Sequence, residues 1–113
     1  MSQSDALASI RRHAHLFLDN LPQFKDPYLD SVHAAYEPGA LDAKTKHLMA
    51  LCGGLVSGCT GCILGQTDMA LSKGATVDEV LETCGVALSL GGTLAWSQSA
   101  KVAAYLEEKG LLD

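Results

Sequence analysis

Residues 58–66 read Gly-Cys-Thr-Gly-Cys-Ile-Leu-Gly-Gln, and the rest of the chain is interpreted as the support for this stretch. It contains a Cys-x-x-Cys pair, Cys59 and Cys62, in an apolar and glycine-rich segment. Two thiols three residues apart on a helix lie on one face, close enough to form a disulfide, bind a soft metal or pass electrons. The surroundings of the pair indicate which of these uses is favoured.

Length and composition predict a single domain over residues 1–113 with one modest core. Hydrophobic residues make up 48% of the chain but aromatic residues only 5%, so small side chains fill most of the core. A domain of this size that depends on close packing of small residues often completes its core against another subunit, and we expect a homo-oligomer. Trp96, the only tryptophan, is expected in the core or in a subunit interface.

The charge distribution excludes two classes of partner. The net charge is −5, and the eight Lys and Arg residues are scattered, with Arg11-Arg12 as the only basic pair. This argues against nucleic acid and anionic membranes. The first five residues do not resemble a secretory signal, and no apolar run reaches the roughly 18 residues that a spanning helix requires. We expect a cytoplasmic protein.

Capping residues and hydrophobic spacing predict an all-α fold of about six helices with short connections. Asp26-Pro27 is expected to open the second helix, Asp42 the third and Thr76 the fifth, while Gly91-Gly92 separates the fifth from the sixth. The predicted helices cover residues 4–20, 27–36, 43–57, 59–73, 77–90 and 93–108. Gly58 allows a bend between the third and fourth helices.

A zinc site is the first alternative use of the thiol pair. Structural zinc takes four ligands, usually from two paired motifs, and the second pair is missing here. Cys52 and Cys84 each stand alone in apolar surroundings, where a small buried hydrophobe is the simpler interpretation. We therefore predict no metal and no other cofactor. Two buried cysteines that happen to be three residues apart are the other alternative.

A redox use fits the physical setting of the pair better. A thiolate at the start of a helix is stabilised by unpaired backbone N–H groups and by the helix dipole. Gly58 and Gly61 leave the sulfurs approachable. Oxidation by a hydroperoxide would form a sulfenic acid at one cysteine, which the other would convert into a disulfide. These considerations leave open which thiol attacks.

Several further segments accompany the thiol pair in a fixed order. They are residues 41–48 (LDAKTKHL), residues 74–80 (GATVDEV), Gly91-Gly92 and a closing helix. In this order the chain resembles the carboxymuconolactone decarboxylase superfamily, in its AhpD-like alkylhydroperoxidase branch. The resemblance covers about residues 41–108, a motif-bearing core that follows N-terminal helices in residues 1–40. It implies an AhpD-like helical fold that assembles as a dimer, trimer or hexamer.

The resemblance also implies roles for four residues. Cys62 would react with peroxide and Cys59 would resolve the product, while a glutamate before the pair and a histidine after it relay protons through water. His47 and Gln66 stand at those two positions, so both depart from the family pattern. Imidazole can accept and return a proton near neutral pH, whereas an amide only forms hydrogen bonds. The relay is therefore either rebuilt around His47 or absent.

The leading hypothesis is a thiol-dependent oxidoreductase of the peroxiredoxin or alkylhydroperoxidase type. Its substrates would be small hydroperoxides or disulfides, and its reductant a lipoyl- or thioredoxin-type dithiol. One alternative is carboxymuconolactone decarboxylase-like chemistry on a lactone, against which the absence of any Arg after Arg12 counts. The other is a non-catalytic oligomeric protein whose proton relay has decayed.

Overall fold

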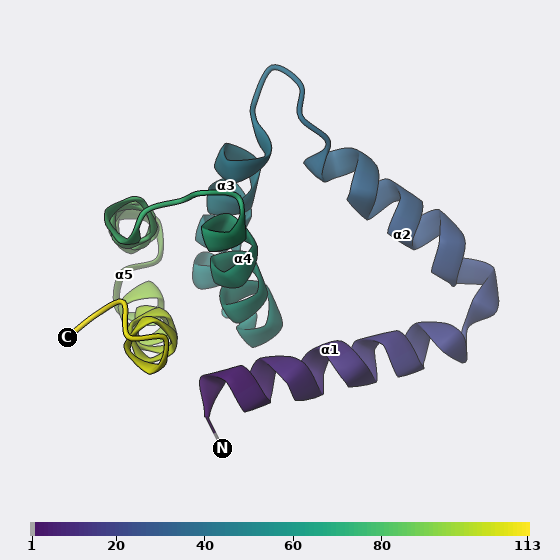
Figure 1. Cartoon of the computed structure of the whole chain (residues 1–113), viewed down its shortest axis with the longest axis horizontal. Coiled ribbons are helices and arrows are strands. Elements are labelled where there is room, and N and C mark those ends of the chain that lie inside the picture. The colour runs from purple at the N-terminus through teal and green to yellow at the C-terminus, as the bar shows by residue number, and fades with distance from the viewer. Residues whose placement is uncertain (1) are drawn as a thin grey trace.

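The computed structural model describes residues 2–113, which form five helices and no strand (Figure 1). The predicted all-α fold is therefore confirmed. The helices, in chain order, are α1 (Gln3–Asp19), α2 (Pro22–Tyr36), α3 (Ala43–Ser57), α4 (Thr60–Ser72) and α5 (Val77–Glu108). No helix of the described part combines the length and the hydrophobicity that crossing a membrane requires.

The core lies where α3, α4 and α5 pack against one another. Fully buried aliphatic side chains from all three helices meet there, namely Leu51, Leu55, Ile63, Val80, Val102 and Leu106. A second cluster of Leu7, Leu64 and Tyr105 joins the first half of α1 to this core. The start of α4, where the thiol pair lies, is thus packed against both α3 and α5.

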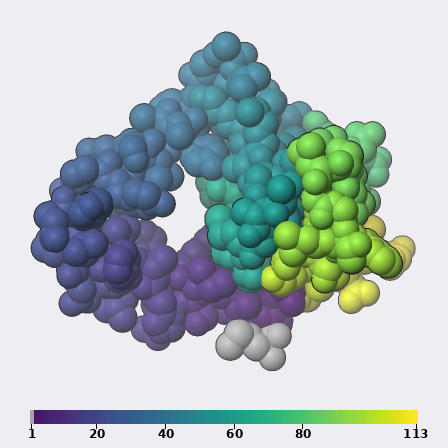
Figure 2. Space-filling view, turned by 180° about the vertical axis from the view of Figure 1, so that it is seen from behind, coloured from purple at the N-terminus to yellow at the C-terminus, as the bar shows by residue number. Residues whose placement is uncertain are grey.

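Helix α2 stands away from this core. None of its residues is buried, and it contacts α1 and the start of α3. An opening separates α2 from the core helices in the space-filling view (Figure 2). The predicted start of this helix at Asp26-Pro27 is wrong, because α2 begins at Pro22 and Pro27 lies inside it. Pro22 has the fixed φ that suits a first helical position, and an early Pro27 removes only one backbone hydrogen bond.

The predicted fifth and sixth helices are the two helical segments of α5, which are joined by a kink at Gly92, so the predicted break at Gly91-Gly92 is confirmed. Gly92 adopts φ 54° and ψ −133°, which is not a helical conformation and interrupts α5 with a kink. This conformation has positive φ, which only glycine reaches without strain. The preceding Gly91 lies against α3, since a Cβ built on it would be 3.7 Å from the Val56 backbone. The glycine pair thus bends the helix around α3.

Candidate active site

The turn between α3 and α4 sets up the site. Gly58 ends α3 with a left-handed φ of 75°, and its N–H donates to the carbonyl of Gly54. The N–H of Cys59 donates to the same carbonyl at 3.0 Å. The chain reverses at this point, so α4 packs back along α3. Residues in the first turns of α3 are thereby placed beside residues of α4 that lie one turn after Cys62.

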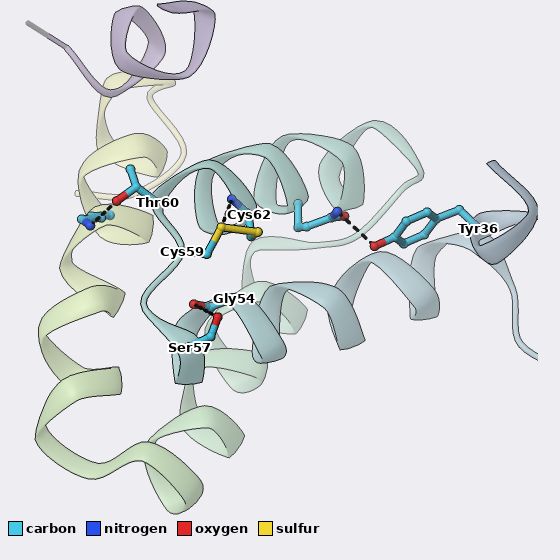
Figure 3. Close-up of a disulfide and its surroundings, with 8 residues drawn as sticks. Tyr36, Gly54, Ser57, Cys59, Thr60 and Cys62 are labelled. Carbon is cyan, nitrogen blue, oxygen red and sulfur yellow. Dashed lines mark hydrogen bonds between the residues drawn. A yellow bond between two sulfur atoms is a disulfide. The ribbon is translucent and has the colours of Figure 1, made fainter. Parts of the chain in front are cut away.

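Cys59 and Cys62 lie at bonding distance and form a disulfide, with their Cα atoms 5.2 Å apart (Figure 3). Cys59 is the N-cap residue of α4, and its sulfur accepts the backbone N–H of Cys62 at 3.2 Å. Cys62 is exposed and Cys59 is partly buried. The separation of the two Cα atoms is one that a disulfide spans readily, so the backbone suits oxidation of the pair.

Glycines let the neighbouring helices approach the thiol pair closely. A Cβ built on Gly54 of α3 would lie 2.9 Å from Cβ of Cys62, closer than side chains tolerate. A Cβ built on Gly61 of α4 would lie 3.0 Å from the side chain of Ile10 in α1. The backbone of α3 therefore packs directly against Cys62. Helix α1 packs against α4 at Gly61, which lies between Cys59 and Cys62 in the sequence.

The two positions at which the sequence departs from the family pattern meet in space. Nδ1 of His47 lies 2.7 Å from Oε1 of Gln66. Nε2 of Gln66 donates to the hydroxyl oxygen of Tyr36 at 3.1 Å, a contact drawn in Figure 3. The Tyr36 ring also stacks on the His47 ring, with centroids 4.4 Å apart and planes 4° from parallel. We call these three residues the relay cluster.

The hydrogen bonds of the relay cluster indicate its proton chemistry. With the Gln66 amide oriented so that Oε1 faces the ring, Nδ1 of His47 is the donor in their contact. Nε2 of His47 is then the nitrogen that can accept a proton. The His47 side chain is 4% exposed, so the ring is held in place by its neighbours rather than by water. The arrangement suits a base whose orientation is set by Gln66 and Tyr36.

Tyr36 is the member of this cluster that the sequence did not reveal. It lies at the end of α2, in the N-terminal segment outside the resemblance. No periodic spacing links it to His47, since the loop between α2 and α3 separates them. Only the course of that loop brings the phenol over the imidazole.

Comparison with known proteins identifies the family. A model of the Carboxymuconolactone decarboxylase family matches residues 22–105. The chain belongs to this family. Among curated proteins it is 32% identical over 83 residues to uncharacterized protein 4 in the cox locus of Paracoccus denitrificans, covering 74% of this chain and 75% of that one. It is 31% identical over 74 residues to the uncharacterized protein H16_B0147 of Cupriavidus necator, covering 66% of each chain.

Two solved structures of carboxymuconolactone decarboxylase family proteins resemble this one closely. The first, an apo protein from Legionella pneumophila, has a TM-score of 0.86 and 30% identity over 94% of this chain and 95% of that chain. The second, from Thermotoga maritima, has a TM-score of 0.83 and 28% identity over 93% and 90% of the two chains. An involvement in antioxidative response has been suggested for the Thermotoga protein. The family and its helical fold are thus established for this chain.

In this family member a cavity of about 480 Å³ opens beside the relay cluster. Tyr36, His47 and Gln66 line it, together with Met69 and Lys73 farther along α4. Gln66 lies one helical turn after Cys62. The cavity thus begins one helical turn after Cys62, and neither cysteine of the pair is among its lining residues.

The remaining cysteines lie elsewhere. Cys84 is 6% exposed, and burial raises the pKa of its thiol. Cys52 is partly buried and packs against the same core. The prediction of a small buried hydrophobe is confirmed for Cys84. Within residues 2–113 no group of three His, Cys, Asp or Glu side chains is placed to hold a metal ion.

Proposed function

We propose that the protein is a thiol-dependent oxidoreductase in which Cys59 and Cys62 cycle between dithiol and disulfide while small hydroperoxides or disulfides are reduced. One observation carries the proposal: the two cysteines lie at bonding distance at the N-terminus of α4, and Cys62 is an exposed residue. The membership of the family and the antioxidative role suggested for the Thermotoga relative support it.

With a hydroperoxide, the thiolate of Cys62 attacks the distal oxygen. The O–O bond breaks, an S–O bond forms, and the alkoxide leaves as an alcohol after taking up a proton. The thiol of Cys59 then attacks the Cys62 sulfur, the S–O bond breaks and water leaves. The pair has given two electrons to the peroxide. A dithiol of the lipoyl or thioredoxin type returns two electrons and two protons.

The exposure of the two cysteine residues supports this order of attack. Cys62 is exposed, so a peroxide can reach its sulfur from solvent, while Cys59 is partly buried at the helix cap. Cys59 remains close enough to condense with the oxidised Cys62, since their Cα atoms are 5.2 Å apart. The proposed division is therefore Cys62 as the peroxide-reactive residue and Cys59 as its resolving partner.

In this proposal the relay cluster transfers the protons. His47 takes the proton that Cys62 loses and returns it to the departing alkoxide, with Gln66 holding the imidazole in position. Gln66 is one turn from Cys62 on the same helix, so the imidazole that it orients faces this part of α4, and water carries protons between Nε2 of His47 and the thiol. No step requires Gln66 to change its protonation state.

The test is a single turnover of the reduced protein with cumene hydroperoxide. We expect one peroxide to be consumed and two thiols to be lost per chain. Cys59→Ser should stop at a sulfenic acid that dimedone labels at Cys62, and Cys62→Ser should lose the reaction. Cys52→Ser, at a free cysteine outside the pair, should react like the parent. Peroxide consumption by Cys62→Ser at the parental rate would refute the proposal.

A further inference from the structure

Lys101 of α5 lies against the end of α4 that carries the thiol pair. Its Nζ donates to Oγ1 of Thr60 at 2.6 Å, across 41 residues of chain. Thr60 follows Cys59 directly and is the first residue of α4. Figure 3 shows Thr60 on the turn of chain that also bears Cys59 and Cys62. An ammonium group from a different helix is thus held at the first residue of α4, directly after Cys59.

The charge of Lys101 is not balanced by a carboxylate. Three ion pairs between side chains occur in residues 2–113, and Lys101 takes part in none of them. Its hydrogen bond goes to a neutral hydroxyl instead. An ammonium group without an anionic partner gains most from a negative charge that develops nearby.

The other charged groups that pack along α4 are already accounted for. Arg11 of α1 pairs with Asp68 at 3.1 Å. Tyr105 of α5 donates to the same carboxylate, and burial beside Asp68 raises its pKa to about 12 and keeps it neutral. From α3, His47 is hydrogen-bonded to Gln66. Unlike Arg11, Lys101 has no carboxylate partner in residues 2–113.

The junction of α5 with the α3–α4 turn is also shielded from water. Gln98, one turn before Lys101, lies beside Gly58, because a Cβ built there would be 3.9 Å from Gln98 Nε2. The Oε1 atom of Gln98 is buried and has no hydrogen-bond partner within residues 2–113. Lys101 itself is partly buried. Charges interact more strongly in such a setting than on an open surface.

We propose that Lys101 is the positioning residue whose cation holds the reduced Cys59–Cys62 pair in its thiolate form. The inference rests on the proposed function, since it concerns the state that attacks the substrate. The N-terminus of α4 and the ammonium group act in the same direction, because both favour a negative charge on sulfur. Two neighbouring thiols titrate as a coupled pair, and Lys101 lowers the pKa at which the pair loses its first proton.

The experiment follows the rate of iodoacetamide alkylation of the reduced protein from pH 5 to 10, with peptide mass spectrometry to assign the label to each cysteine. Lys101→Met removes the charge and keeps the length of the side chain, and Lys101→Arg restores the charge. Lys109→Met is the matched control, because Lys109 lies at the far end of α5 over the Tyr105 ring.

We expect the alkylation midpoint of Lys101→Met to rise by about half to one pH unit, with a rate at pH 7 reduced about 3- to 10-fold. Lys101→Arg and Lys109→Met should keep the parental midpoint. A loss of packing alone would lower stability without moving the midpoint. If Lys101→Met does not fold, Lys101→Gln serves the same purpose.

The outcomes separate this inference from the proposed function. Equal midpoints in the parent and in Lys101→Met would overturn the role of Lys101. If that common midpoint lies well below the roughly 8.5 of an ordinary thiol, the pair is still activated, but a group other than Lys101 lowers its pKa. If the parent pair titrates like ordinary thiols and consumes no peroxide, the proposed function fails as well.

Discussion

Nδ1 of His47 and Oε1 of Gln66 are 2.7 Å apart, although 19 residues separate them in the chain. The contact exists because Gly58 reverses the chain between α3 and α4. It brings together the two positions at which the sequence differs from the family pattern. His47, oriented by Gln66, stands where the family pattern that the sequence resembles has a glutamate.

His47→Ala is expected to slow disulfide formation by cumene hydroperoxide by about 10- to 100-fold, because general acid–base groups contribute 10²–10⁴ in rate and solvent replaces part of this. The measurement is thiol loss in a single turnover at pH 7. His15→Ala is the control, since His15 is exposed on α1 and lies outside the relay cluster. Equal rates for His47→Ala and the parent would remove His47 from the mechanism.

Gly54→Ala and Gly53→Ala form a matched pair of stability predictions. A Cβ on Gly54 would lie 2.9 Å from Cβ of Cys62, so Gly54→Ala should lower the free energy of unfolding by about 1–3 kcal/mol. A Cβ on Gly53 meets nothing within 4 Å, so Gly53→Ala in the same helix should raise it by about 0.5–1 kcal/mol. Guanidinium unfolding of the reduced proteins measures both. Similar effects of the two substitutions would contradict the close approach of α3 to the thiol pair.

The sequence predicted those parts of the structure that depend on local chemistry. Asp42 caps α3 through the N–H of Thr45, and Thr76 with Glu79 forms the capping box that starts α5. The bend at Gly58 was also expected. These features depend on residues within one turn of each other, which is why a single sequence reveals them.

What the sequence did not show depends on distant parts of the chain. Tyr36 reaches His47 only because of the path of the loop before α3, and Lys101 reaches Thr60 only because α5 bends at Gly92 and packs against α4. The start of α2 was misplaced because both Pro22 and Pro27 suit a first helical position. Side-chain spacing carries no information on such long-range contacts, so these residues required the structure.

The exposed apolar side chains of α5 make the expected homo-oligomer testable. Leu90 and Trp96 are 71% and 69% exposed, which places Trp96 outside the core of the single chain. Large apolar groups gathered on one element mark a surface that a partner covers, and we expect a second copy of this chain to cover them. Sedimentation velocity of Trp96→Glu should show a smaller species than the parent. Ser97→Glu, at the exposed neighbouring position, should keep the parental mass. A monomeric parent would contradict the expectation.

The Tyr105 hydroxyl predicts how stability changes at alkaline pH. Burial, together with the hydrogen bond to Asp68, raises the pKa of Tyr105 to about 12 in the folded chain, against 10.0 for an unperturbed tyrosine. Below pH 10 both states keep the proton and the contribution to stability is complete. Above pH 10 the unfolded chain loses this proton first, so stability falls as the pH rises toward 12.

Tyr105→Phe removes this titration and therefore isolates it. Between pH 9 and pH 11 the parent should lose about 1 kcal/mol more of its free energy of unfolding than Tyr105→Phe does. Guanidinium unfolding at the two pH values measures the difference, and other titrating groups cancel because both proteins share them. Tyr28→Phe, at an exposed tyrosine, should follow the parent. Parallel pH curves for the parent and Tyr105→Phe would show that Tyr105 is not held neutral by the Asp68 contact that ties α5 to α4.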